Sequence, residues 1–174
     1  MTPLEKLEGG DRRSLGRAAE VLRDVLADPT LFEEVFGGMW DSDPMVCLRV
    51  ADVVEKISRT RPEWLAPFKR LLLDQAARVE QIEVRWHIAR MLPRLKLTRS
   101  ERAEAAAIAS VYFGGKSNIV KVMALQAFAD LAAEGDRAMR EESARRIDDA
   151  LRSGSPAVRA RARKLLKGPA REGW

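Results

Sequence analysis

The sequence of 174 residues contains few of the side chains on which catalytic and metal sites are usually built. It has one cysteine, Cys47, one histidine, His87, and one tyrosine, Tyr112. A single cysteine excludes a disulfide within the chain, and with only one histidine there is no zinc site made of several Cys or His ligands. A Ser-His-Asp triad would have to use His87, and no Gly-x-Ser-x-Gly segment supplies the serine. We therefore expect no metal and no cofactor, and the sequence favours a protein that is not an enzyme.

Long apolar runs are also missing. The longest largely apolar stretch, residues 105–113, has nine residues, whereas a membrane span needs about 20. The start of the chain, Met1 to Gly16, is charged and contains glycine, and it lacks the apolar core of a signal peptide. These features predict a cytoplasmic protein that does not enter a membrane.

Aromatic residues make up only 6% of the chain, while Ala, Leu, Arg and Glu are abundant. This balance favours helices over strands, and no segment has the alternating pattern of a strand. The length suits one domain with a sizeable core. We therefore expect an all-α protein.

The net charge of +5 is unevenly distributed. Residues 1–80 carry 12 Lys/Arg and 15 Asp/Glu, whereas residues 81–174 carry 19 Lys/Arg and 11 Asp/Glu. The first part therefore has a net charge of −3 and the second part +8. A basic second half permits acidic partners, including nucleic acid, although such charge is also common on ordinary solvated helices.

An internal repeat organises most of the chain. Four segments align on their valines, and these valines recur at a nearly constant interval: Val46, Val84, Val120 and Val158. Apolar residues follow each valine at four, seven and eight positions, and in the first three segments also at eleven. This spacing is typical of one apolar stripe on an α-helix.

Capping signals place further helices between these segments. Thr30-x-x-Glu33 and Thr98-x-x-Glu101 have the form of capping boxes, and Asp43-Pro44 and Ser155-Pro156 join an N-cap to a proline in the first turn. Ser117 and Asp136 are further candidate caps. The predicted helices are residues 12–27, 30–40, 43–58, 62–78, 82–95, 99–113, 117–133, 136–152 and 155–167.

The repeated segments resemble a known family. DPMVCLRVA, EVRWHIA and SPAVRARA resemble the second helix of HEAT repeats, in which a cap is followed by Val-Arg and small residues, and WLAPFKRLLL resembles a first helix with an interior proline, Pro67. The resemblance covers residues 30–167. It implies a right-handed α-solenoid of about four HEAT-like, armadillo-like repeats, with the helix 12–27 as an N-terminal cap. We expect one domain over residues 1–174, with residues 1–11 and 168–174 as loosely ordered tails.

In a HEAT-like solenoid the second helices line the concave face. If Val84, Ile88 and Met91 face the core, Trp86 and Arg90 point to the opposite side of the helix, with His87 and Arg94 beside them. The equivalent positions of the other repeats add Leu48, Arg49, Asp52, Arg161 and Lys164 to the predicted groove. An exposed tryptophan beside arginines is typical of a binding surface. In the alternative arrangement, Trp86 packs against a neighbouring helix and Arg90 stacks on it.

Two functions follow from these features. The favoured one is a non-catalytic scaffold that holds a protein or peptide on its concave face. The alternative is a nucleic-acid-binding protein that uses the basic second half. It draws on a resemblance to the alkylpurine DNA glycosylases built from HEAT-like repeats, which would place Asp52 opposite Trp86 and Arg90.

Overall fold

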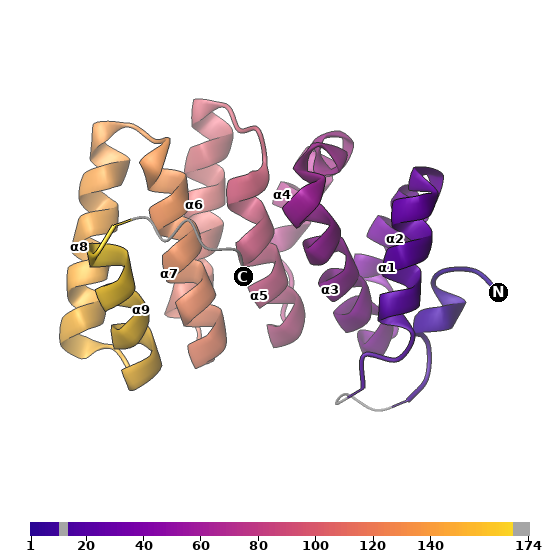
Figure 1. The fold of residues 1–174 in the computed structure, drawn as a ribbon. Helices are drawn as coiled ribbons and strands as arrows, with labels where there is room; N and C mark the ends of the chain where they lie inside the picture. Colours follow the sequence, from indigo (N-terminus) through magenta and orange to yellow (C-terminus); the bar gives the residue numbers. More distant parts are fainter. Residues whose placement is uncertain (11–13, 169–174) are drawn as a thin grey trace. The chain divides into compact units, whose positions relative to one another are not determined.

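The computed structural model describes residues 1–10 and 14–168, and all regular structure in these residues is helical (Figure 1). The prediction of an all-α protein is confirmed. The chain divides into two compact units, Met1–Leu95 and Lys96–Trp174. Among the helices of the described residues, none is both long and apolar enough to cross a membrane.

The first unit contains α-helices joined by short 3-10 segments. The α-helices of its described residues are α1 (Ala18–Ala27), α2 (Phe32–Gly37), α3 (Pro44–Thr60), α4 (Lys69–Ala76) and α5 (Ile82–Met91). The 3-10 segments are η1 (Glu5–Leu7), η2 (Pro29–Leu31), η3 (Gly38–Trp40), η4 (Pro62–Phe68) and η5 (Leu92–Arg94). The long helix α3 packs against both α1 and α5, so it forms the centre of this unit.

Several helices of the first unit are shorter than predicted. The predicted helix 62–78 begins as η4, because Pro67 has no amide hydrogen to donate and its ring obstructs the preceding turn, and α4 starts only at Lys69. Thr30 is not the predicted N-cap. Its amide instead donates to Asp28, which caps η2. The first residues of the predicted helix 12–27 lie outside the described residues, and α1 begins at Ala18.

The start of the chain is held against this unit instead of forming a loose tail over residues 1–10. Leu7 in η1 is fully buried. Lys6 reaches two acidic side chains of α1, with Nζ 2.9 Å from Glu20 Oε1 and 2.6 Å from Asp24 Oδ2. Of the predicted tail 168–174, only Gly168 is among the described residues.

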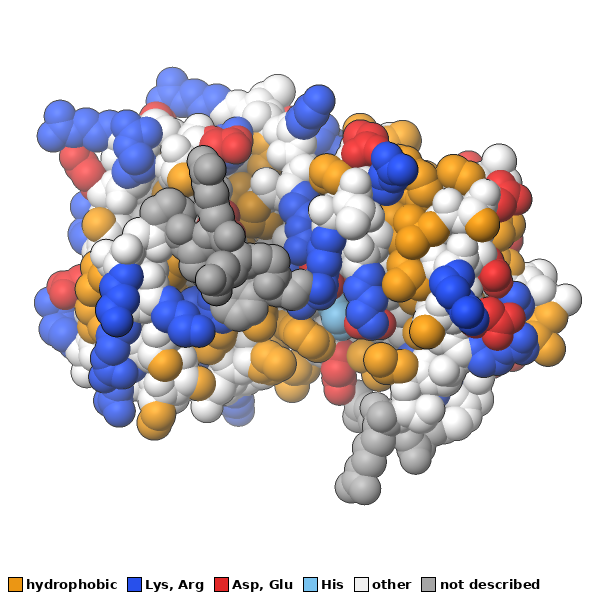
Figure 2. Space-filling model, viewed as in Figure 1, with side chains coloured by type: hydrophobic (Ala, Val, Ile, Leu, Met, Phe, Trp, Pro, Cys, Tyr) orange, Lys and Arg blue, Asp and Glu red, His pale blue; other side chains and the backbone are white. Residues whose placement is uncertain are grey.

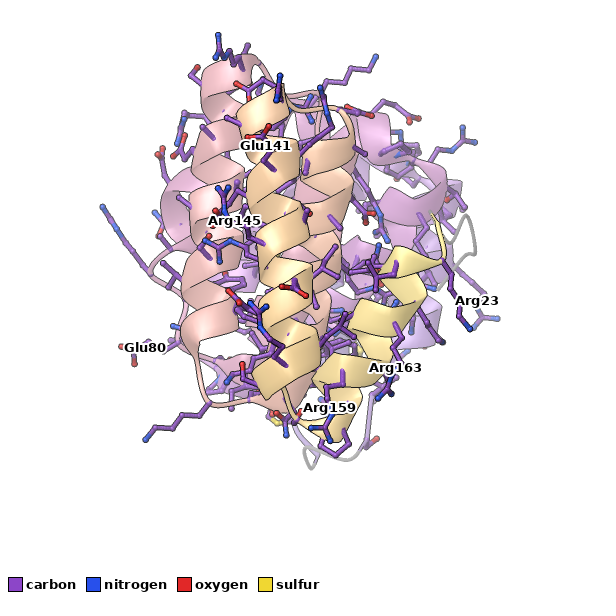
Figure 3. All side chains as sticks on the ribbon, turned by 90° about the vertical axis from the view of Figure 1, so that its left-hand side faces the viewer. Arg23, Glu80, Glu141, Arg145, Arg159 and Arg163 are labelled. Carbon is purple, nitrogen blue, oxygen red and sulfur yellow. The ribbon has the colours of Figure 1, made fainter. Side chains whose placement is uncertain are left out.

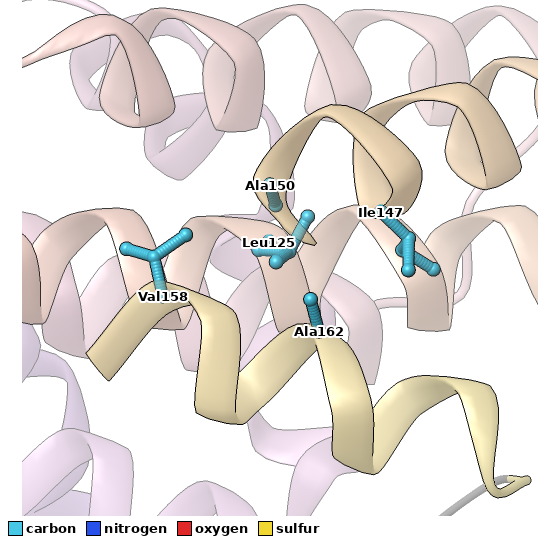
Figure 4. Packing of buried hydrophobic residues seen from close by; sticks show 5 residues of the cluster. All are labelled: Leu125, Ile147, Ala150, Val158 and Ala162. Atoms are coloured by element: carbon cyan, nitrogen blue, oxygen red, sulfur yellow. The ribbon is translucent and has the colours of Figure 1, made fainter. Parts of the chain in front are cut away.

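The second unit consists of two helical hairpins. Helices α6 (Arg99–Gly114) and α7 (Asn118–Ala133) form one, and α8 (Arg137–Ser153) and α9 (Pro156–Leu166) form the other. Helix α7 packs against α8 and α9, and small side chains such as Ala150 and Ala162 let the helices approach closely around Leu125 (Figure 4). Charged side chains, among them Glu141, Arg145 and Arg163, point away from this packing (Figure 3).

The predicted caps of the second unit are present. Thr98 and Glu101 form a complete capping box at α6, in which each side chain accepts a hydrogen bond from the other residue's amide. The side chains of Ser117, Asp136 and Ser155 accept amide hydrogen bonds at the starts of α7, α8 and α9. These caps satisfy amides that have no partner inside their helix.

The repeat alignment correctly predicts the buried face of four helices. The four aligned valines are each 1–2% exposed: Val46, Val84, Val120 and Val158. The apolar residues four positions later are fully buried in every repeat: Val50, Ile88, Ala124 and Ala162. In each unit two of these helices pack against each other, α3 with α5 and α7 with α9.

Candidate binding surface

A fully buried carboxylate on α3 gathers three arginines in the first unit. Glu55 accepts hydrogen bonds from Arg59 Nη2 (2.7 Å) and from Arg94 Nη2 (2.8 Å), and Arg90 Nε lies 3.3 Å from its Oε1. Glu55 and Arg59 are four residues apart and therefore share one helix face. Arg90 on α5 and Arg94 in the following η5 reach the carboxylate because α5 packs against α3.

Arg94 also bonds to groups other than the carboxylate. Besides the carboxylate, its Nη1 donates to the Glu55 carbonyl oxygen (2.9 Å) and to Ser58 Oγ (2.6 Å). Burial acts to raise the pKa of Glu55, but hydrogen bonds from Arg59 and Arg94 and the charges of Arg94 and Arg90 outweigh it, so that the pKa lies below its usual value. Glu55 is therefore ionised at neutral pH.

A second ion pair lies beside the first group on α3. Lys56 Nζ is 2.7 Å from Asp52 Oδ2. We call the whole set the α3–α5 basic cluster, and it consists of Asp52, Glu55, Lys56, Arg59, Arg90 and Arg94. Its four cations and two carboxylates leave two positive charges in excess. In Figure 2, basic side chains gather beside the pale blue side chain of the chain's single histidine, His87.

His87 is buried under this cluster and only 2% exposed, so the prediction that it lies on the groove surface is wrong. His87 stands three residues after Val84 and four before Met91. This spacing places it within the apolar stripe of α5. Burial lowers the pKa of His87 to about 4, against smaller effects of Asp52 and Glu55 that raise it. The imidazole is therefore neutral at pH 7.

Trp86 is partly exposed and lies against the histidine, with ring centroids 4.1 Å apart. Two buried polar atoms of the same helix have no hydrogen-bond partner among the described residues, Nδ1 of His87 and Nη2 of Arg90. Buried polar atoms are usually paired, and an unpaired one calls for an explanation such as a functional role. The region therefore combines a partly exposed aromatic ring with more cations than carboxylates to pair with them.

The structure brings together five of the nine predicted groove residues, all in the first unit: Asp52, Trp86, His87, Arg90 and Arg94. The other four are Leu48 and Arg49 in the first unit and Arg161 and Lys164 in the second. Of these, Leu48, Arg49 and Arg161 are buried, and only Lys164 is exposed.

Arg49 is buried because its guanidinium faces the N-terminal segment. It donates hydrogen bonds to the carbonyl oxygens of Leu7 (2.6 Å), Gly9 (2.5 Å) and Ser14 (3.0 Å). Arg161 is buried at 7% exposure, and its Nη1 donates to Gln126 Oε1 (3.0 Å). The prediction that these two arginines are accessible in a groove is wrong, since both guanidinium groups form hydrogen bonds inside their own unit.

Sequence reasoning missed Glu55, Arg59 and Lys56, which complete the cluster. The spacing of four residues between Glu55 and Arg59 was a usable signal for an ion pair. Nothing in the sequence pattern indicated that the carboxylate is fully buried, or that it attracts arginines from another helix.

The second unit contains a surface hollow of about 550 Å³ between the start of α6 and the start of α8. Its charges are matched, because Arg99 pairs with Asp136 (2.9 Å) and Arg102 with Glu134 (3.2 Å). The described residues also contain no group of three or more His, Cys, Asp or Glu that could hold a metal ion. The α3–α5 basic cluster is therefore the stronger candidate for a functional site.

Comparisons of the chain with protein-family models, curated proteins and solved structures give no match.

The buried histidine leads to a prediction about acid stability. Because the folded pKa of about 4 lies below the ordinary value of 6.5, the unfolded chain binds the proton more readily. Stability should therefore be full above pH 6.5 and fall as the pH decreases towards 4. We expect a loss of about 2 kcal/mol in the free energy of unfolding between pH 7 and pH 5, measured by urea denaturation.

His87→Gln is the matched control, because glutamine stays uncharged over this range and His87 is the chain's only histidine. Its free energy of unfolding should change little between the same two pH values. An equal pH dependence in His87→Gln and the wild type would show that another group is responsible.

Proposed function

We propose that the protein is a non-catalytic interaction module that binds a protein or peptide on the face formed by α3 and α5. The observation that carries the proposal is the position of a partly exposed tryptophan, Trp86, next to a basic cluster with two excess positive charges. Tryptophan and arginine are enriched among the residues that dominate binding energy at protein interfaces.

The proposal includes a HEAT-like α-solenoid architecture. Its support is the nearly constant interval between the aligned valines, the burial of the same position in all four repeats, and the pairwise packing of α3 with α5 and of α7 with α9. Helix pairs that repeat in this way bury their apolar faces by stacking, and such repeats commonly bind partners along one face.

The geometry gives less support to the glycosylase alternative. That alternative needs an acidic residue available in the groove, and Asp52 was its candidate. Asp52 is 8% exposed and its carboxylate pairs with Lys56 at 2.7 Å. A flipped base also needs stacking partners on both faces, and Trp86 already has His87 against its ring.

Site-specific photo-crosslinking in the native cell tests the proposed surface. Benzoylphenylalanine in place of Trp86 keeps an aromatic ring at the site, and the same probe in place of Arg70 on α4 serves as an exposed control in the same unit. We expect a discrete protein adduct from position 86 and none of that mass from position 70. Adducts of equal yield at both positions, no adduct, or adducts with nucleic acid alone would contradict the proposal.

The partner identified by mass spectrometry then permits a quantitative test. Trp86→Ala should weaken its binding about 30-fold, corresponding to about 2 kcal/mol, as expected for the loss of an aromatic anchor. Arg70→Ala should leave the affinity unchanged. Equal affinities of the wild type and Trp86→Ala would show that Trp86 is not an anchor.

A further inference from the structure

The charge balance of the α3–α5 basic cluster indicates what kind of group its partner presents. Both of its carboxylates are already engaged, Glu55 by three arginines and Asp52 by Lys56. Arg90 interacts least closely with the Glu55 carboxylate. Its Nε is 3.3 Å from Glu55 Oε1, and its buried Nη2 has no partner among the described residues. Three guanidinium groups therefore share one carboxylate, and Arg90 is the one whose donors are least engaged.

Arg90 is also the least hydrated cation of the cluster, with 12% of its side chain exposed. Burial lowers its pKa more than the nearby charge of Glu55 raises it. A cation that has lost water without gaining a full partner is unfavourable, and a charge-assisted hydrogen bond to an anion offsets that loss. Because the guanidinium charge is delocalised, an anion at its exposed edge acts on the whole group.

We infer that this surface takes the side-chain carboxylate of a partner's Asp or Glu that stands next to an apolar residue. The carboxylate pairs with Arg90 and Arg94, and the apolar side chain packs on Trp86. This inference rests on the proposed function and specifies the partner as an acidic, amphipathic segment of a protein.

The number and setting of the charges favour a carboxylate over nucleic acid. Only two positive charges are in excess, whereas nucleic-acid-binding proteins commonly neutralise about six to ten phosphates. Arg90 and Arg94 are fixed by Glu55, with 12% and 22% of their side chains exposed, so they are poorly placed to follow a phosphate backbone.

Two synthetic peptides of equal length and an oligothymidylate of similar length serve as probes. One peptide alternates Glu and Leu pairs and the other has Gln in place of every Glu, so that they differ only in charge. Binding is followed on the ¹⁵N-labelled wild-type protein through the Nε–Hε signals of its arginines and the indole signal of Trp86. This measurement needs no variant and thus does not depend on the folding of one.

We expect the Glu/Leu peptide to shift the signals of Arg90, Arg94 and Trp86, and to bind at least tenfold more tightly than the Gln/Leu peptide. Lys56→Gln, which removes one excess charge from a side chain that is 36% exposed, should weaken the Glu/Leu peptide about threefold to tenfold. Arg70→Gln removes an equal charge from α4 and should leave the affinity unchanged.

Equal binding of both peptides at Trp86 would overturn the inference and leave the proposed function intact. Tighter binding of the oligothymidylate than of the Glu/Leu peptide, or shifts confined to other arginines, would also overturn it. If neither peptide binds at about 1 mM, the inference is rejected, and photo-crosslinking at position 86 decides the proposed function separately.

Discussion

Replacing Glu55 with glutamine is expected to lower the free energy of unfolding by about 3–5 kcal/mol. The carboxylate is fully buried and accepts hydrogen bonds from Arg59 and Arg94. Glutamine has nearly the same shape but no charge, so three arginines would lose the carboxylate that they share, and Arg90 and Arg94 are largely buried. The cost is large because the desolvation of the arginines persists after the attraction is removed.

Urea denaturation at pH 7 measures this difference, and Asp74→Asn provides the matched control. Asp74 also pairs with an arginine four residues away, Arg70, at 2.6 Å, but both side chains are more than half exposed. An exposed pair of this kind contributes about 0.3–0.5 kcal/mol, and salt screens it. If Glu55→Gln costs no more than Asp74→Asn, the buried carboxylate does not compensate the charges of the three arginines as described.

The apolar spacing was sufficient to predict the four repeated helices and their buried faces. A stripe at four, seven and eight residues after each valine depends only on helix geometry, and Val46, Val84, Val120 and Val158 are buried as predicted. The caps at Thr98, Ser117, Asp136 and Ser155 were equally predictable, because each acts within one turn of its own helix. The start of α4 was not predicted, since the effect of Pro67 on the preceding turns competes with an otherwise helical pattern.

The candidate site was only partly predictable because its members come from different helices. Arg90 and Arg94 were identified from their position opposite the stripe, yet their partner Glu55 lies on another helix, far earlier in the chain. Periodicity shows which face of a helix is apolar, but it does not show what packs over the remaining faces. His87 was misplaced because it was assigned to the face of Trp86 and Arg90, although its spacing from Val84 and Met91 also fits the buried stripe.

Arg49 shows the same limit and leads to the second large predicted effect. By repeat position it was equivalent to His87 and Arg161, but it is 1% exposed and holds the segment before α1. Its donors reach the carbonyl oxygens of residues 7, 8, 9 and 14. Two glycines with positive φ allow the backbone to approach this closely, because a Cβ on Gly10 would lie 3.0 Å from Arg49 Nη2 and one on Gly16 3.2 Å from its Cζ.

Arg49→Met is therefore expected to lower the free energy of unfolding by about 3 kcal/mol. Methionine fills much of the same space but donates nothing, so several carbonyl oxygens lose a charged donor, and each such bond contributes about 1.5–3 kcal/mol. The loss is smaller than the sum of the bonds, because residues 8, 9 and 14 are exposed and water can reach their carbonyl groups. The substitution should also have a local effect. Relative to the wild type, Arg49→Met should speed up hydrogen exchange at the amide of Leu7 much more than at the amide of Val50 in the middle of α3.

Arg23→Met is the control, since Arg23 is exposed on α1 and its replacement should change the free energy of unfolding by no more than about 0.5 kcal/mol. Hydrogen exchange separates two explanations for a loss in Arg49→Met. If Arg49 acts by holding the N-terminal segment, protection is lost first at Leu7 and at the start of α1, while α3 and α5 keep theirs. Uniform loss of protection across the first unit would instead mean that Arg49 stabilises the packing of α3 itself, and an unchanged free energy of unfolding would show that water replaces its donors without cost.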